Sequence, residues 1–282
     1  MLKKLIFIVD EKITLPNYKN SDTKVVRQNK TDEIDSSERE NTIYVCDDSD
    51  VAKRLCVAGE NVVALLTEEN IDSDFSFCKY AVMEVSSQGL KYGRVEGIEF
   101  DYGVFTNFSP DHIGPNEHDS MEDYAASKSI LFRRCKKAVV NNDDQSVNEI
   151  LRNHTCLVSS FGIESDADLK ALDIEFIKEN GRLGMKFKTV GAVCDEFTVY
   201  TPGMFSVYNS LVTIYICNLL GIENNAIKEG LLKVKVRGRV ELVPCSPDFS
   251  VIIDYAHNEV STKSVMNTLA EYKPNRMICV YG

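Results

Sequence analysis

The chain has 282 residues, 44% of them hydrophobic and 27% charged, a balance typical of a globular protein with one large core. Its formal charge of −11 argues against the clustered basic surface that binding to nucleic acid requires. No apolar run reaches the roughly 20 residues of a membrane span, so we expect no membrane partner either. The nine cysteines form no C-x-x-C pair, which favours a reducing, cytoplasmic location.

Residues 1–78 are expected to form a divergent N-terminal βαβ segment. An apolar run at 5–9 predicts a strand, and the polar stretch over 17–41 predicts a linker because it has no apolar periodicity. TIYVC at 42–46 and VVALL at 62–66 then predict two strands separated by an amphipathic helix.

From residue 79, short β-branched or aromatic runs alternate with helical segments. KYAVMEV, DYGVFTNF and KKAVVNN each end in polar residues, and a helical segment over 120–135 separates the last two. This alternation predicts an α/β fold with a mostly parallel sheet flanked by helices, whose ligands gather at the carboxyl ends of the strands. Three later runs with period-two alternation, ALDIEFIK, LGMKFKTV and EFTVYT, predict a small antiparallel β subdomain.

The last part of the chain predicts three helices, over 204–220, 224–234 and 259–272. FSVIIDY and the terminal RMICVYG predict strands. We therefore expect a central domain over 79–260 and the truncated start of a further domain over 261–282.

Two strand-to-loop segments carry residues suited to chemistry. MEVSSQGL places Glu84 at the end of a strand, a position suited to Mg²⁺, although a solvated carboxylate is the commoner outcome there. Ser86 and Ser87, which follow, could equally cap a helix. VFTNFSPDHIG places His112 in a polar loop, where an isolated histidine is usually a plain surface residue.

A third segment, DSMEDYAASKSILF, predicts a helix with Ser120 as its N-cap and Asp123 three residues on, as in a capping box. Lys128 falls on the apolar face of this helix. A lysine there either extends to solvent, which is the commoner outcome, or loses its charge. A neutral amine would capture CO₂ as a carbamate and so supply a metal-binding carboxylate.

These segments resemble the signatures of the Mur ligase family, in the same order and at similar spacing. The likeness rests on MEVSSQGL, GRV, FTNFSPDH and MEDYAASKSILF, and is greatest to the UDP-N-acetylmuramoyl-dipeptide ligases. It implies a catalytic, Mg²⁺-binding set of Glu84, His112 and carbamylated Lys128. It also implies muropeptide contacts by Ser86 and Arg94. The subgroup usually has histidine in place of Gln88 and glutamine in place of Tyr92.

The resemblance continues through TPGMFSVYNS, GRVEL and FSVIIDYAHNEVS, and covers about 79–282. It implies that five residues lie near a bound ATP: Asn209, Arg239, Asp254, His257 and Asn258. The family's glycine-rich P-loop cannot be formed upstream of Glu84, because residues 1–83 contain one glycine, Gly59. We also expect the family's amino-acid-binding domain to be missing after residue 282.

The resemblance implies an ATP-dependent acid–amino-acid ligase of peptidoglycan precursor synthesis that adds an amino acid to a UDP-MurNAc-peptide, here degenerate or truncated. One alternative is a non-catalytic module that binds a muropeptide or a nucleotide. Another is one part of a split ligase, with a complementary chain that supplies the P-loop or the C-terminal domain. A folylpolyglutamate-type ligase is disfavoured by EVSSQGLKYGRV, which is closer to the muropeptide ligases.

Overall fold

The computed structural model describes residues 80–280 except 111–112, 116, 180, 235, 237, 244–248 and 257–258, together with three earlier strands. Those strands and Tyr80–Met83 (β4) form a four-stranded parallel sheet in the order β1-β2-β3-β4. The earlier strands are Lys24–Arg27 (β1), Thr42–Cys46 (β2) and Asn61–Leu66 (β3). The predicted strand at 5–9 and the helix between β2 and β3 lie outside the described residues.

The linker expected over 17–41 contains strand β1, which corrects that prediction. In β1, Val25 pairs with Ile43 and Val26 with Tyr44 of β2. Adjacent β-branched valines favour an extended backbone, so a neighbouring strand is enough to order this short run within a charged stretch.

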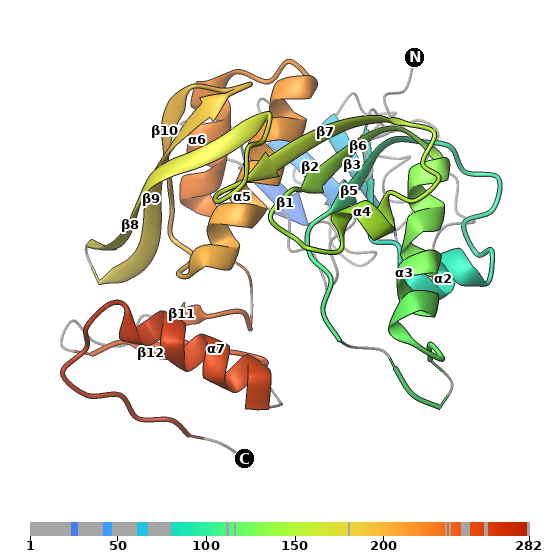
Figure 1. Ribbon diagram of the computed structural model, residues 1–282. Helices are drawn as coiled ribbons and strands as arrows, with labels where there is room; N and C mark the ends of the chain where they lie inside the picture. The colour runs from blue at the N-terminus through green and yellow to red at the C-terminus, as the bar shows by residue number, and fades with distance from the viewer. Residues whose placement is uncertain are drawn as a thin grey trace.

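The second sheet has six strands in the order β10-β9-β8-β7-β6-β5. Its parallel part comprises Phe100–Phe105 (β5), Cys135–Asn141 (β6), Leu157–Gly162 (β7) and the start of Leu169–Glu179 (β8). Strand β8 then pairs antiparallel with Arg182–Gly191 (β9), which pairs with Asp195–Val199 (β10). The α/β fold is confirmed, and the antiparallel strands extend the parallel sheet (Figure 1).

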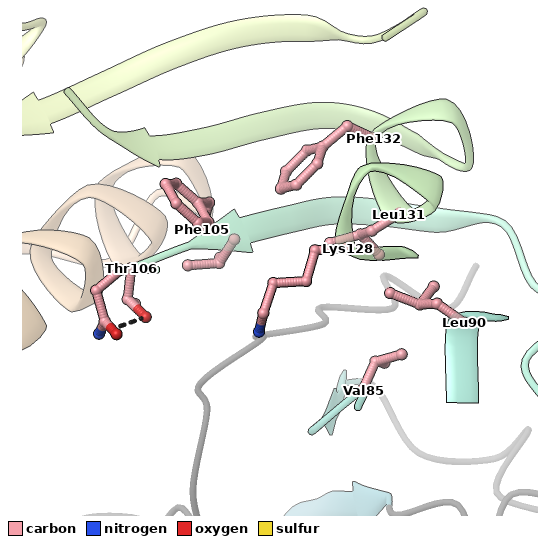
Figure 2. A pocket seen from close by; sticks show the side chains of 9 residues that line it. Val85, Leu90, Phe105, Thr106, Lys128, Leu131 and Phe132 are labelled. Atoms are coloured by element: carbon pink, nitrogen blue, oxygen red, sulfur yellow. Dashed lines mark hydrogen bonds between the residues drawn. The ribbon is translucent and has the colours of Figure 1, made fainter. Parts of the chain in front are cut away.

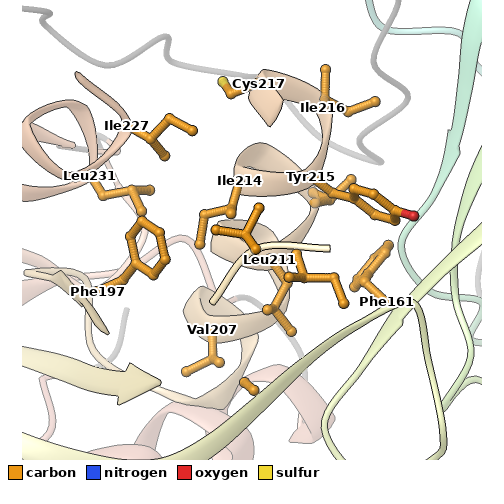
Figure 3. Close-up of a cluster of buried hydrophobic side chains, with 14 of the residues drawn as sticks. Phe161, Phe197, Val207, Leu211, Ile214, Tyr215, Ile216, Cys217, Ile227 and Leu231 are labelled. Carbon is orange, nitrogen blue, oxygen red and sulfur yellow. The ribbon is translucent and has the colours of Figure 1, made fainter. Parts of the chain in front are cut away.

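Two groups of helices pack buried side chains against the sheets. Met204–Leu219 (α5) packs its buried side chains on β7 to β10, and Asn224–Lys233 (α6) adds side chains to the same cluster. Figure 3 shows Leu211 and Ile214 of α5 and Leu231 of α6 in this cluster. Ser87–Lys91 (α2), Met121–Ser129 (α3), the 3₁₀ turn Ile130–Arg133 (η2) and Val147–Ile150 (α4) surround a second cluster. That cluster includes Met83 from β4 and Phe105 from β5, so it joins the strands that carry the candidate site.

The C-terminal part contains the antiparallel pair Glu241–Val243 (β11) and Val251–Ile253 (β12), followed by Glu259–Ala270 (α7). The Tyr272 hydroxyl donates a hydrogen bond to the carbonyl of Gly184 at 2.8 Å, which ties the end of this part to β9. The strand predicted for RMICVYG is wrong for its described residues, 276–280, which have no regular structure. A strand needs a neighbour for its backbone hydrogen bonds, and here Ile278 and Val280 are largely exposed.

Candidate functional site

The ends of β4, β5 and β6 supply the polar side chains of the site. Glu84 follows the last residue of β4, Thr106 follows β5, and Asn141 ends β6. The Asn141 amide donates to the carbonyl of Thr106 at 2.8 Å, and both side chains are buried. This bond fixes the loop that leaves β5. A small cavity lies at the same edge of the strands, and Val85, the residue after Glu84, is part of its lining.

The side chain of Lys128, from α3, is one of those that line this cavity. Figure 2 shows Lys128 extending between Val85 and Leu90 on one side and Phe105 on the other, with Thr106 on the same side as Phe105. Lys128 is only 7% exposed, and its Nζ lies 4.9 Å from the centre of the Tyr124 ring. The cavity has a free volume of about 10 Å³. Since that is about the space one water molecule needs, the cavity admits a small group and excludes a nucleotide.

Both serines after Glu84 have structural partners. Ser86 is the N-cap of α2, and its Oγ accepts a hydrogen bond of 2.9 Å from the Gly89 amide, so the capping alternative is confirmed for this residue. Ser86 remains exposed, whereas Ser87 is 6% exposed and lies against His118. Arg94, in the turn after α2, is exposed on the same segment.

The predicted N-cap of α3 is confirmed, but the predicted capping box is not. The Asp123 amide donates to Ser120 Oγ at 3.2 Å. The Asp123 carboxylate does not return this bond; it accepts from Lys91 Nζ at 2.6 Å, from the Asp119 amide at 3.3 Å and contacts His118 Nδ1 at 3.1 Å. The Lys91 hydrogen bond is the main reason that the pKa of Asp123 is lowered to about 2.

Sequence reasoning missed His118, which is fully buried. Its Nε2 lies 2.8 Å from Ser87 Oγ, and its ring stacks on Tyr124 with the ring centres 4.9 Å apart. Nothing local to His118 predicts these contacts, because Ser87 is 31 residues away in sequence. The only available signal is its place two residues before the helix cap Ser120.

The predicted nucleotide-side residues fall on other elements. Asn209 is exposed on α5. Arg239 and Asp254 are brought together at β11 and β12: Asp254 accepts from the amide of Val240 at 2.7 Å, and Arg239 lies over the ring of Tyr255. His112, His257 and Asn258 lie outside the described residues, so their predicted roles stay predictions.

The donor set near Lys128 fits a hard cation such as Mg²⁺ only in part. The Glu84 carboxylate and a carbamate on Lys128 would offer oxygen ligands, which Mg²⁺ prefers. Over the part of the chain that the structure describes, no three His, Cys, Asp or Glu side chains gather closely enough to hold a metal. The described helices also include none that is long and apolar enough to cross a membrane.

A family model of the Mur ligase middle domain matches residues 64–217, which spans β4, the Lys128 helix and most of α5. The chain belongs to the Mur ligase family. A second family model, of the Mur ligase glutamate ligase domain, matches residues 238–282. The start of this domain was expected at residue 261, with the rest missing. The match begins earlier, at residue 238, so more of the domain is present than expected.

Two curated relatives are 2,6-diaminopimelate ligases acting on UDP-N-acetylmuramoyl-L-alanyl-D-glutamate. The protein of Caldanaerobacter subterraneus is 41% identical over 206 residues, and that of Clostridium perfringens is 37% identical over 211 residues. In both comparisons the match covers 72% of this chain and 42% of the relative, so this chain spans less than half of each relative's length.

A solved structure of a ligase with the same name superposes with a TM-score of 0.59 at 25% identity. The superposition covers 70% of this chain and 41% of the other. The likeness to the dipeptide ligases, inferred above from MEVSSQGL and its companions, is confirmed by these comparisons.

Proposed function

We propose that this chain forms the part of a Mur-type ligase that holds a UDP-MurNAc-dipeptide and its metal ion, in a reaction that joins an amino acid to the peptide with ATP. The observation that carries the proposal is that buried Lys128 lines a small cavity at the ends of β4 and β5, together with Val85, the residue that follows Glu84. The relatives at 41% and 37% identity are named as ligases of this substrate class, which supports it further.

Lys128 acts in this proposal as a carbamate. The Lys128 ammonium first loses one proton; the neutral amine nitrogen then bonds to the carbon of CO₂ and releases a second proton to solvent, which turns a cation into an anion. The walls beside the amine include the apolar side chains of Val85, Leu90 and Phe105, which limit its contact with water. The carbamate oxygens and the Glu84 carboxylate would then hold Mg²⁺, which when bound offsets negative charge on a transferring phosphoryl group.

The muropeptide is proposed to lie along α2 and the turn that follows it. Ser86 and Arg94 are both exposed there, and Arg94 supplies a permanent positive charge that a carboxylate or a diphosphate would pair with. Gln88 and Tyr92 lie on the same segment, and Tyr92 is 60% exposed. These two positions depart from the subgroup's usual residues, so contacts to this part of the substrate are the ones we expect to differ.

The single glycine in residues 1–83 favours a second candidate function. Without a P-loop the β- and γ-phosphates of ATP lack their usual cradle of backbone amides. The chain would then bind the muropeptide without catalysis, or would act as one part of a split ligase with a complementary chain that supplies the phosphate site. The folylpolyglutamate alternative has less support, because the curated relatives act on muropeptides.

Calorimetric titration of the purified chain tests both candidates. UDP-MurNAc-L-Ala-D-Glu and Mg·ATP are added separately, in bicarbonate buffer, to the wild type, Lys128→Met and Glu84→Gln. Lys136→Met is the matched control, because its side chain is 70% exposed and pairs with Asp101. Millimolar or tighter binding of both ligands, weakened in the two site variants only, supports the ligase. Binding of the muropeptide alone supports the non-catalytic candidate, and binding of neither overturns the proposal.

A further inference from the structure

A chain of four polar side chains joins α2 to the start of α3. Ser87 Oγ lies 2.8 Å from His118 Nε2, and His118 Nδ1 lies 3.1 Å from Asp123 Oδ2. Lys91 Nζ donates to the same carboxylate oxygen at 2.6 Å. Ser87 and Lys91 belong to the short helix that follows Glu84, whereas Asp123 belongs to the helix that carries Lys128.

The hydrogen positions in this chain follow from the carboxylate. With the pKa of Asp123 lowered to about 2, chiefly by the Lys91 hydrogen bond, its carboxylate only accepts at neutral pH. Nδ1 of His118 therefore carries a hydrogen and donates it to Asp123. Nε2 is left to pair with the Ser87 hydroxyl, so both ring nitrogens are satisfied and the plane of the buried ring is fixed.

The His118 ring contacts Tyr124, and Tyr124 in turn contacts Lys128. His118 stacks on Tyr124 with ring centres 4.9 Å apart, and the same Tyr124 ring lies 4.9 Å from Lys128 Nζ. Phe108 packs on Tyr124 as well, with the ring centres 4.7 Å apart. The Tyr124 ring is thus held between neighbours, and the Lys128 amine lies against it.

The Ser87–His118–Asp123 order also matches the arrangement that activates a serine nucleophile, but burial argues against that role. Ser87 is 6% exposed and His118 is fully buried, so a carbonyl group has no approach to Ser87 Oγ. Ser87 does not line the Lys128 cavity either. The arrangement is suited to holding two helices in register.

We propose that His118 is a positioning residue for the Lys128 site. Its two hydrogen bonds hold the start of α2 to the start of α3, and its ring positions Tyr124 and thereby the Lys128 amine. The position of Lys128 does not depend on which ligand the site binds. The effect of His118 on muropeptide binding rests on the proposed function above.

Trace acetylation with acetic anhydride, read by mass spectrometry, tests the positioning of Lys128. The rate at Lys128 is divided by that at Lys136, an exposed lysine in the same molecule. His118→Leu, which removes the supporting ring, is expected to raise this ratio about fivefold, the size of one lost cation–π contact. His118→Phe keeps the stacked ring and loses both hydrogen bonds, so the ratio is expected to stay within about twofold of the wild type.

Tyr124→Leu removes the middle ring and is expected to raise the acetylation ratio as much as His118→Leu does. It tests the positioning of Lys128 if His118→Leu does not fold. Asp195→Asn, which breaks the Lys228 ion pair far from the site, controls for general loosening of the chain. An unchanged ratio in a folded His118→Leu or Tyr124→Leu protein overturns the proposal. An equal rise in Asp195→Asn overturns it too, because a structural loss anywhere would then have the same effect.

Titration with UDP-MurNAc-L-Ala-D-Glu supplies the second readout. Loss of the Ser87 and Asp123 hydrogen bonds shifts α2, so His118→Phe is expected to weaken binding about tenfold although its acetylation ratio is normal. Equal affinity in His118→Phe and the wild type would overturn the link from His118 to α2. A wild type that does not bind the dipeptide counts against the proposed function, while the acetylation ratio still decides the positioning of Lys128.

Discussion

The Tyr208 hydroxyl donates a hydrogen bond of 2.9 Å to Oδ2 of Asp143, and thereby joins helix α5 to the residues that follow β6. The same carboxylate accepts three backbone amides from the turn after β7: Ile163 at 2.6 Å, Glu164 at 3.0 Å and Ser165 at 2.7 Å. Asp143 therefore fixes a turn and a helix at once. Asn209, one of the residues predicted to lie near a bound ATP, is the residue after Tyr208.

Tyr208→Phe is expected to lower the free energy of unfolding by about 1.5 kcal/mol, the lower end of the usual net value for a hydrogen bond to a charged group. Burial, and then the hydrogen bond to Asp143, raises the pKa of the Tyr208 phenol, so the hydroxyl stays protonated as the donor. Urea unfolding measures the change. Tyr200→Phe is the control: its hydroxyl donates to Glu179 at an exposed site, and we expect a change below about 0.5 kcal/mol. Equal losses would refute a special role for Tyr208.

Acid is expected to weaken the fold through Asp143. Burial alone would raise the pKa of this carboxyl, but the amides of Ile163, Glu164 and Ser165 with the Tyr208 hydroxyl outweigh burial and lower the pKa from 3.8 to about 2. Because the folded-state pKa is the lower one, the stabilisation is present above about pH 4 and is lost as the pH falls toward 2.

The contribution of Asp143 is on the order of 2 kcal/mol at neutral pH. Asp143→Asn should remove most of it and should flatten the pH dependence of unfolding in that acid range. Urea midpoints measured at intervals between pH 5 and pH 2 would show the difference between the two proteins. Parallel curves for the wild type and Asp143→Asn would mean that other carboxylates govern the acid transition.

Ser120→Ala is expected to destabilise the protein by about 1 kcal/mol, because it removes the side chain that caps α3. Ser146 provides a matched serine at the N-cap of α4, where the side chain makes no capping hydrogen bond. Ser146→Ala should therefore change the thermal midpoint by less than half as much. The prediction fails if the two variants lose the same stability.

Leu211→Ala is expected to cost about 2–5 kcal/mol, since the side chain is fully buried in the cluster between α5 and the sheet. Leu157→Ala, on β7, provides the comparison, because Leu157 is 74% exposed and should matter by less than about 0.5 kcal/mol. Urea unfolding followed by circular dichroism distinguishes them. A small loss at Leu211 would mean that this cluster is not the main core.

Much of the sheet could be predicted because its strands carry their own pattern. The runs at β4, β5 and β6 are apolar and end in polar residues, and β8 to β10 alternate with period two. Strand β7 was missed because LVSSFG has two serines at its centre and neither pattern. Its pairing with β6 on one side and β8 on the other orders it, which is a tertiary effect.

The candidate site could be predicted only for residues whose setting is local. Ser86 and Ser120 cap helices because they immediately precede them, and Lys128 lies inward because of its place on the helix face. His118 could not be found this way, since its partners Ser87 and Tyr124 come from two different helices. The strand expected for RMICVYG failed for a related reason: its pattern suits a strand, but its described residues, 276–280, pair with no strand among the described parts of the chain.

The part from Glu241 to Val280 holds no buried side chain among its described residues, although it forms β11, β12 and α7. Secondary structure without a core of its own has little cooperativity, and its backbone amides should exchange hydrogen much faster than those of α5. Calorimetry should accordingly find an unfolding enthalpy per residue below the usual ~0.7 kcal/mol, because this part melts without contributing to the main peak. A partner that covers Val251 and Ile253 would stabilise this segment and protect its backbone amides from exchange. Hydrogen exchange at these amides is therefore a sensitive reporter of any partner that binds there.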